Sequence, residues 1–238
     1  DPVSDASGEA FWIRDEDSGR YWSPTPMPAR GQGRYTTRHG FGYSVFEHVE
    51  DGLATELTVY VALDASVKFS VLRLSNRSGR SRRLSLTGYV EWVLGDLRPK
   101  QAMHVVTESD SATGALLARN SFNMEFPNRV AFFDVDAEEA GSRSATGDRL
   151  EFLGRNRGLR NPAALSRARL SGRLGAGMDP CAALQVGFEL EDGETREVVF
   201  RLGLGRDLAD ARTLIQRFRG SGAAAQALEL VRSHWRST

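Results

Sequence analysis

Alternation of apolar and polar residues with a period of two is the feature that most restricts how this chain can fold. One run places its apolar residues on a single parity: Leu84, Leu86, Val90, Trp92 and Leu94. The pattern returns in residues 184–190 and 198–204. Because successive side chains of a strand point to opposite faces of a sheet, each run predicts a strand with one buried face.

Further runs of this kind predict an antiparallel arrangement. They cover residues 10–14, 43–50, 53–63, 67–75, 115–119 and 128–135. Asp51-Gly52 and Asp192-Gly193 each stand between two consecutive runs, where an Asp-Gly pair is a strong signal for a hairpin. Roughly ten or more strands joined by short turns predict packed antiparallel sheets.

Helical spacing replaces the alternation after Gly205. Asp207 is suited to cap a first helix and Gly220 to end it. A second helix has its apolar residues at helical spacing: Ala224, Ala227, Leu228, Val231 and Trp235. We therefore divide the chain into a β domain, residues 1–205, and a helical segment, residues 206–238. The start at Asp1 and the helix that runs to Thr238 predict that the chain is a piece of a longer polypeptide.

Composition excludes several classes of protein. Of the 238 residues, 40% are hydrophobic, which is enough for a sizeable core. The 31 basic residues balance the 31 acidic ones, so no net field attracts nucleic acid. No apolar run approaches the ~18 residues of a membrane-spanning helix. The single cysteine, Cys181, excludes an internal disulfide framework and a multi-cysteine zinc site, and it indicates a reducing compartment.

Few residues with reactive side chains form a recognisable motif. Gly203-Leu204-Gly205 lies between a strand and a helix, but it lacks the third glycine of a dinucleotide-binding loop, so a simple turn is the better interpretation. Cys181 is expected to be a buried, inert thiol. The histidines have no metal-binding spacing, although the first two could meet across strands: His39, His48, His104 and His234. No cofactor or metal is expected.

Carboxylates are candidates for catalysis because glycosidic chemistry commonly uses a facing pair. Two pairs are close in the sequence: Asp134 with Asp136, and Asp148 with Glu151. Charged side chains are rarely buried, so we expect exposed strand ends or turns at these positions. Asn76-Arg77-Ser78 has the form of a glycosylation acceptor, and an ordinary turn is expected there.

Aromatic residues crowd the first fifth of the chain: Phe11, Trp12, Tyr21, Trp22, Tyr35, Phe41, Tyr43 and Phe46. Flat rings with a polar edge suit the faces of sugars, and they suit the core of a sandwich equally well. The residues alone leave both interpretations open.

Seven short segments, in this order, carry a resemblance to a known family: Tyr21-Trp-Ser-Pro-Thr25, Arg38-His-Gly-Phe-Gly-Tyr-Ser44, Phe46-Glu-His48, Glu91-Trp-Val-Leu-Gly95, Thr113-Gly-Ala-Leu-Leu-Ala-Arg-Asn120, Glu151-Phe-Leu-Gly-Arg155 and Asp179-Pro-Cys-Ala-Ala-Leu-Gln185. Together they resemble the β-sandwich domain of glycoside hydrolase family 94, formerly glycosyltransferase family 36. The likeness is strongest to the phosphorylase-like region of bacterial cyclic β-1,2-glucan synthases, and it covers essentially the whole chain.

The resemblance implies an antiparallel β-supersandwich of the galactose-mutarotase-like type with C-terminal helices. In the family an (α/α)6 barrel follows and carries the aspartate general acid and the phosphate site, so no catalytic residue is carried over to this chain. The segment from Arg38 to Ser44 resembles a loop that the family keeps beside its active site. On this ground Trp22, Arg38, His39 and Tyr43 are the expected substrate-binding residues.

The expected function is a non-catalytic, carbohydrate-binding or structural module of a glycosyltransferase or phosphorylase acting on β-1,2-glucan. The expected partners are the catalytic barrel of the same polypeptide, a β-glucan oligosaccharide and a second copy in a homodimer, without nucleic acid. The parent protein is expected to be membrane-associated, on the cytoplasmic side of the bacterial inner membrane. Two alternatives remain: a self-sufficient mutarotase- or lyase-like enzyme using His39, Glu47 and His104, and a pure interdomain scaffold.

Overall fold

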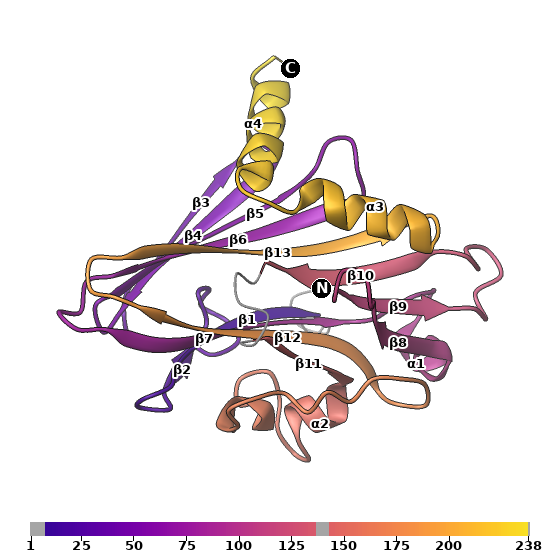
Figure 1. Cartoon of the computed structure of the whole chain (residues 1–238), viewed down its shortest axis with the longest axis horizontal. Coiled ribbons are helices and arrows are strands. Elements are labelled where there is room, and N and C mark those ends of the chain that lie inside the picture. The colour runs from indigo at the N-terminus through magenta and orange to yellow at the C-terminus, as the bar shows by residue number, and fades with distance from the viewer. Residues whose placement is uncertain (1–7, 137–142, 238) are drawn as a thin grey trace.

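Two antiparallel sheets, with α3 (Leu208–Phe218) and α4 (Ala223–Arg236) over the outer face of the larger one, form the framework of the part of the chain that the structure describes (Figure 1). The computed structural model describes residues 8–136 and 143–237, so Asp1 and Thr238, the two ends discussed above, lie outside it. The mostly antiparallel β class with C-terminal helices is confirmed.

The smaller sheet has five strands in spatial order: β11 (Arg143–Asp148), β12 (Pro180–Leu190), β7 (Arg82–Glu91), β1 (Glu9–Asp15) and β2 (Tyr21–Trp22). The larger has eight: β3 (Tyr35–Gly40), β4 (Tyr43–Glu50), β5 (Leu53–Val61), β6 (Val67–Asn76), β13 (Thr195–Gly205), β10 (Val130–Val135), β9 (Leu116–Asn120) and β8 (Val105–Ser109). The helices are α1 (Arg98–Gln101), α2 (Arg149–Leu153), α3 (Leu208–Phe218) and α4 (Ala223–Arg236), with 3-10 turns at Ala102–His104 and Ala163–Ser166.

The main core lies between the two sheets. Phe200 of the larger sheet packs with ring centroids 5.2 Å from Phe11 of the smaller sheet and 5.7 Å from Phe133. The smaller sheet is also covered on its outer face, where residues 149–178 bury Trp12 and Tyr89. The alternation predicts one buried face for β7, whereas almost all of its residues are buried, because this second layer lies over it.

The two Asp-Gly pairs have different outcomes. Asp51-Gly52 joins β4 to β5 in a true hairpin, in which Glu50 pairs with Leu53. Both turn residues have a positive φ, as a type I′ turn requires. The hairpin predicted at Asp192-Gly193 is wrong, because β12 pairs with β7 while β13 pairs with β6. The same local turn chemistry here carries the chain from one sheet to the other.

Asn76 holds that crossover together with a second one, which joins β6 to β7. Its buried side-chain amide donates to the carbonyl oxygens of Arg80 and Leu190, both at 2.8 Å. Its side-chain oxygen accepts from the backbone N–H of Ser78 at 3.0 Å, which makes the turn expected there. The side-chain nitrogen that glycosylation would modify is therefore buried and engaged.

The helices follow the strands as predicted. Asp207 caps α3 by accepting from the backbone N–H of Asp210. Ala211 packs so close to Gly205 that a Cβ there would come within 2.5 Å of the Ala211 backbone nitrogen. Gly205 thus allows α3 to pack closely on β13. None of the helices in the described residues is both long enough and apolar enough to cross a membrane.

Candidate functional site

The segment from Arg38 to Ser44, expected as a loop, is the tip of the β3–β4 hairpin. Gly40 pairs with Tyr43, and Gly42 takes a φ of 78° in the turn between them. Arg38 and His39 are neighbours on β3, so their side chains point to opposite faces of the sheet. The hairpin therefore gathers these residues along the chain but divides them between two faces.

Arg38 and Tyr43 lie on the face that α4 covers. The Arg38 guanidinium is 3.0 Å from the Glu47 carboxylate and 3.8 Å from that of Glu56. The Arg232 guanidinium of α4 lies over the Tyr43 ring, 5.0 Å from its centroid. This face thus presents an exposed arginine held by two carboxylates beside a half-buried ring.

His39 lies on the opposite face and remains exposed. Its Nδ1 is 2.9 Å from the hydroxyl oxygen of Ser44, and its ring meets Phe46 edge-on. The side chain can therefore donate or accept one further hydrogen bond toward solvent or a ligand.

Trp22 occupies a different place altogether. It belongs to β2, at the edge of the smaller sheet, and its side chain is packed in the main core with 2% of its surface exposed. This burial favours the packing interpretation and leaves no ring face for a sugar. Sugar contact by Arg38, His39 and Tyr43 stays a prediction.

A buried carboxylate organises the loop that follows Trp22. Glu50 accepts hydrogen bonds from the backbone N–H groups of Gln32 and Gly33 at 2.8 and 3.0 Å. The Arg20 guanidinium lies 3.0 Å from one Glu50 oxygen, and His48 Nε2 lies 3.2 Å from the other. These contacts hold the end of the loop, at Gln32 and Gly33, against β4.

The surroundings of Glu50 shift its pKa. Burial alone would raise it, but the backbone hydrogen bonds from Gly33 and Gln32 and the charges of His48 and Arg20 outweigh burial and hold the pKa below its ordinary value. Tyr35 completes the group, because its ring stacks on His48 at 3.8 Å and its hydroxyl donates to the carbonyl oxygen of Ser23.

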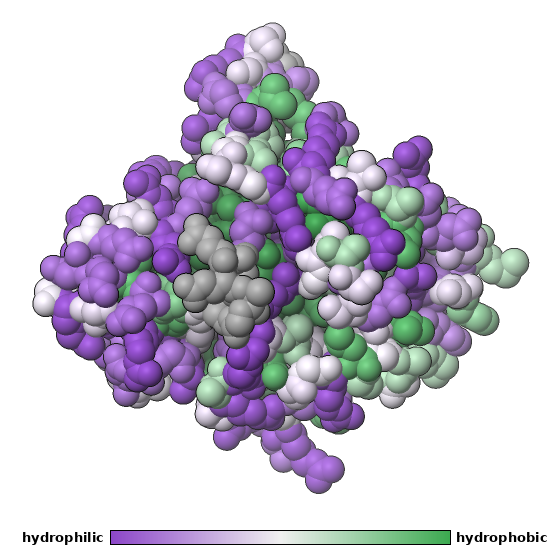
Figure 2. All heavy atoms as spheres, in the orientation of Figure 1, coloured by the Kyte–Doolittle hydropathy of each residue, from purple (hydrophilic) through white to green (hydrophobic). Residues whose placement is uncertain are grey.

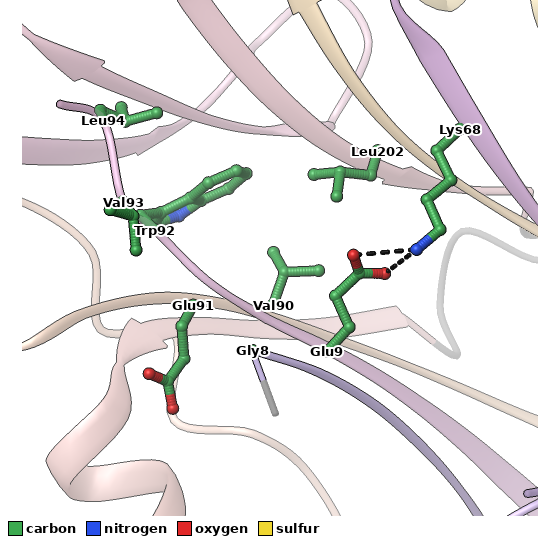
Figure 3. A pocket seen from close by; sticks show the side chains of 9 residues that line it. All are labelled: Gly8, Glu9, Lys68, Val90, Glu91, Trp92, Val93, Leu94 and Leu202. Carbon is green, nitrogen blue, oxygen red and sulfur yellow. Dashed lines mark hydrogen bonds and ion pairs between the residues drawn. The ribbon is translucent and has the colours of Figure 1, made fainter. Parts of the chain in front are cut away.

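A cleft of about 430 Å³ opens between the sheets on another side of the molecule (Figure 3). Lys68 crosses it to form hydrogen bonds of 2.8 and 2.9 Å with Glu9, while Trp92 and Leu202 form apolar walls. Glu91 at its margin is bound by Arg149 at 2.7 Å. Both carboxylates of this cleft are paired with basic side chains, so neither is available to act as a general acid or base.

A second cleft, of about 880 Å³, lies beside a buried charge network. Asp134 and Arg201 are fully buried, and Arg201 also donates to Asp136 at 2.8 Å. Arg219 donates to Asp134 at 3.0 Å, and the Arg143 guanidinium lies 3.8 Å from Asp134. The expectation of an exposed carboxylate is wrong for Asp134, because these arginines compensate its charge. The two aspartates bind one arginine and do not face each other across a cleft.

Two other expected positions also prove to be structural. Asp148 is buried, pairs with Arg173 at 3.1 Å and caps α2 by accepting from the backbone N–H of Glu151, so it is not the exposed carboxylate expected. Cys181 is fully buried, and burial raises the pKa of its thiol well above the usual range, as an inert thiol requires.

The residues of the mutarotase-like alternative do not converge. His39 lies on β3 and His104 directly precedes β8, and these strands are the two opposite edges of the eight-stranded sheet. Seven strand spacings separate the edges by about 30 Å along the sheet. Glu47 forms an ion pair with Arg38, and the His104 ring stacks on that of Phe122. Within the described residues, no group of three or more His, Cys, Asp or Glu side chains is arranged to hold a metal ion.

Comparison with protein families identifies the chain. The family model described as "Glycosyl hydrolase 94, supersandwich domain" matches residues 1–221. The chain belongs to this family. The glycosyl hydrolase 94 supersandwich match includes α3 and ends between α3 and α4.

Relatives of this supersandwich domain are much longer proteins. The cyclic beta-(1,2)-glucan synthase NdvB of Rhizobium meliloti is 36% identical over 99% of this chain, which spans 8% of that protein. The N,N'-diacetylchitobiose phosphorylase of Vibrio furnissii is 25% identical over 98% of this chain, which spans 29% of it. Among solved structures, a bacterial glucoamylase complexed with acarbose has a TM-score of 0.51 at 9% identity, covering 94% of this chain and 28% of that one; this shows the fold alone.

Sequence reasoning missed the polar groups that organise this supersandwich domain. Glu50, Asp134 and Arg201 were not recognised as buried, because a charged residue in an alternating run is assigned to the solvent face. A signal did exist for Glu50. It lies at the end of β4 on the parity of the apolar residue Phe46, which packs against the main core.

Proposed function

We propose that this chain is the non-catalytic supersandwich module of a longer glycosyltransferase or glycoside phosphorylase that acts on β-1,2-linked glucan. The observation that carries the proposal is the 36% identity to a cyclic β-1,2-glucan synthase over 99% of this chain, which spans only 8% of that protein. A chain that matches a small part of several long enzymes behaves as a module of them. In such a parent, a catalytic domain in the same polypeptide supplies the reacting groups.

The geometry favours a module that assists a catalytic domain over a chain that catalyses a reaction by itself. The carboxylates of the cleft in Figure 3 are bound by Lys68 and Arg149, and the His39 and His104 rings lie at opposite sheet edges. The β3–β4 hairpin, by contrast, presents Arg38, His39 and a 77% exposed Phe41 at the rim of the molecule. We infer that this rim helps to wall the active site of the parent, in a homodimer on the cytoplasmic side of the inner membrane.

The test compares the 238-residue chain with a longer polypeptide that also carries the catalytic domain. Both are incubated with phosphate and β-1,2-glucooligosaccharides, and release of glucose 1-phosphate is measured; β-1,4-glucooligosaccharides are the linkage control. We expect release only from the longer protein and only from the β-1,2 substrate. Release of glucose 1-phosphate in proportion to the amount of the 238-residue chain would refute the non-catalytic role. Equal release from the β-1,2 and β-1,4 substrates would refute the proposed linkage specificity.

A further inference from the structure

Residues 149–178 carry a strongly uneven charge. The segment contains one acidic residue, Glu151, and seven arginines: Arg149, Arg155, Arg157, Arg160, Arg167, Arg169 and Arg173. The whole chain is neutral, so the remaining residues carry six more acidic than basic groups. A surface built from this segment therefore has a field that the net charge conceals. We call residues 149–178 the arginine layer.

The arginine layer forms a third stratum below the smaller sheet, on the side away from α3 and α4 (Figure 1). Phe152 and Leu165 anchor it by packing into the cluster with Trp12, whose indole N–H donates to the carbonyl oxygen of Leu159 at 3.2 Å. The layer is thus tied to the sheet at several points and holds its charges at fixed positions. In Figure 2, hydrophilic side chains project from the lower edge of the molecule, where the layer lies.

Some of these arginines form ion pairs with other residues of the protein, and others do not. Arg149 binds Glu91, Arg167 pairs with Glu151, and Arg173 pairs with Asp148. A second group, Arg155, Arg157 and Arg160, lies on one exposed loop between α2 and the 3-10 turn at Ala163–Ser166. Across residues 8–136 and 143–237, none of that second group has an ion pair or a side-chain hydrogen bond. The loop therefore presents three uncompensated guanidinium groups.

The shape and chemistry of the layer indicate the kind of partner it fits. Guanidinium groups bind phosphate oxygens in a bidentate manner. A small anion would need a concave site, yet the two clefts described above are lined by other residues. Leu150, on the same layer, is 63% exposed, which adds an apolar side chain to the basic surface. Basic groups with exposed apolar side chains are typical of contact with an anionic membrane surface.

We propose that the arginine layer docks this protein on an anionic phospholipid surface, with Arg155, Arg157 and Arg160 as the phosphate-binding residues. A neutral glucan offers no charge to these groups, so the site is distinct from any sugar contact on the β3–β4 hairpin. The proposal extends the membrane association of the proposed function, but its test contains no glucan. A failure here therefore leaves the glucan proposal standing.

The experiment measures sedimentation of the 238-residue chain with lipid vesicles at low salt. One set of vesicles is phosphatidylcholine alone, and the other contains phosphatidylcholine and phosphatidylglycerol in equal parts. The test variant is Arg155→Gln/Arg157→Gln/Arg160→Gln. The control is Arg34→Gln/Arg73→Gln/Arg77→Gln, which removes the same charge from exposed arginines elsewhere. Thermal melting of all three proteins establishes that each is folded.

We expect the unchanged chain to bind only the anionic vesicles, and added salt to release it. Each arginine near an anionic surface contributes about five-fold in affinity, so the test variant should bind about a hundred-fold more weakly. The control should bind nearly as well as the unchanged chain. Absence of binding to anionic vesicles, or equal losses in the two triple variants, would overturn the proposal. Equally tight, Arg155-dependent binding to duplex DNA would reassign the layer to nucleic acid.

Discussion

Trp22 and His39 lie close in sequence, but the fold gives their side chains opposite surroundings. Trp22 is 2% exposed in the main core, so Trp22→Ala leaves a large cavity there. We expect it to destabilise the chain by about 3–5 kcal/mol in urea unfolding. His39 is exposed, and its side chain forms a hydrogen bond with Ser44 and an edge contact with Phe46, so His39→Ala should change stability by less than about 0.5 kcal/mol. Equal stabilities of the two variants would contradict this assignment of core and surface.

Glu50 gives a prediction that depends on pH. Its folded-state pKa lies below the ordinary 4.5, so the ionised side chain stabilises the fold above that pH, and this stabilisation is lost as pH falls through the folded pKa. Glu50→Gln should therefore lower the free energy of unfolding by about 1–3 kcal/mol at neutral pH. The difference between the two proteins should shrink below about pH 4.5. A difference that stays constant from neutral to acidic pH would show that the charge of Glu50 is irrelevant.

At the level of single residues, the sequence predicted where groups lie along the chain better than which way they point. Arg38, His39 and Tyr43 were expected at one surface because their segment resembles a loop that the family keeps beside its active site, but strand parity divides them between two faces. Trp22 was ambiguous because an aromatic ring suits a core and a sugar equally well. Parity could be applied only once the segment was recognised as a strand.

At the scale of elements, the strands that were predicted are those inside the sheets. The four edge strands, β2, β3, β8 and β11, were missed. β3, for example, has the sequence YTTRHG, and four of its six residues are exposed, so it carries no apolar parity to detect. An edge strand has one neighbour and needs less burial, and polar residues protect it from pairing with other chains. Because this protection makes edge strands polar, they lack the apolar alternation by which strands are recognised in a sequence.

The contact of α3 with β13 gives an element-scale prediction. A Cβ on Gly205 would lie 2.5 Å from the Ala211 backbone nitrogen, so Gly205→Ala must push the helix from the sheet. We expect a loss of about 1–3 kcal/mol in thermal or urea unfolding. Gly187→Ala is the matched control, because a Cβ there meets only the Leu84 carbonyl oxygen at 3.8 Å. A loss for Gly187→Ala as large as that for Gly205→Ala would attribute the effect to strand glycines in general.

At the scale of the whole molecule, the boundary between the β domain and the helical segment can be tested. We predicted it at residues 205/206, whereas the family match extends to residue 221 and includes α3. The packing of α3 gives the reason to expect the later boundary. Ala211, Ile215 and Phe218 are buried in one cluster with strand residues, and Phe218 meets Phe69 edge-on with centroids 5.2 Å apart.

Two truncations decide between the boundaries. A chain of residues 1–205 would expose the strand side of this cluster, including Phe69. Burial of a large apolar side chain contributes about 1.5–3 kcal/mol, so loss of α3 should remove several kcal/mol and leave an apolar patch that binds a hydrophobic dye and promotes association. A chain of residues 1–221 keeps α3 and loses α4, whose last turn is already exposed at Trp235. We expect it to stay monodisperse with a moderately lower melting temperature. If the chain of residues 1–205 is as stable and as monodisperse as that of residues 1–221, without added dye binding, the boundary lies at residue 205.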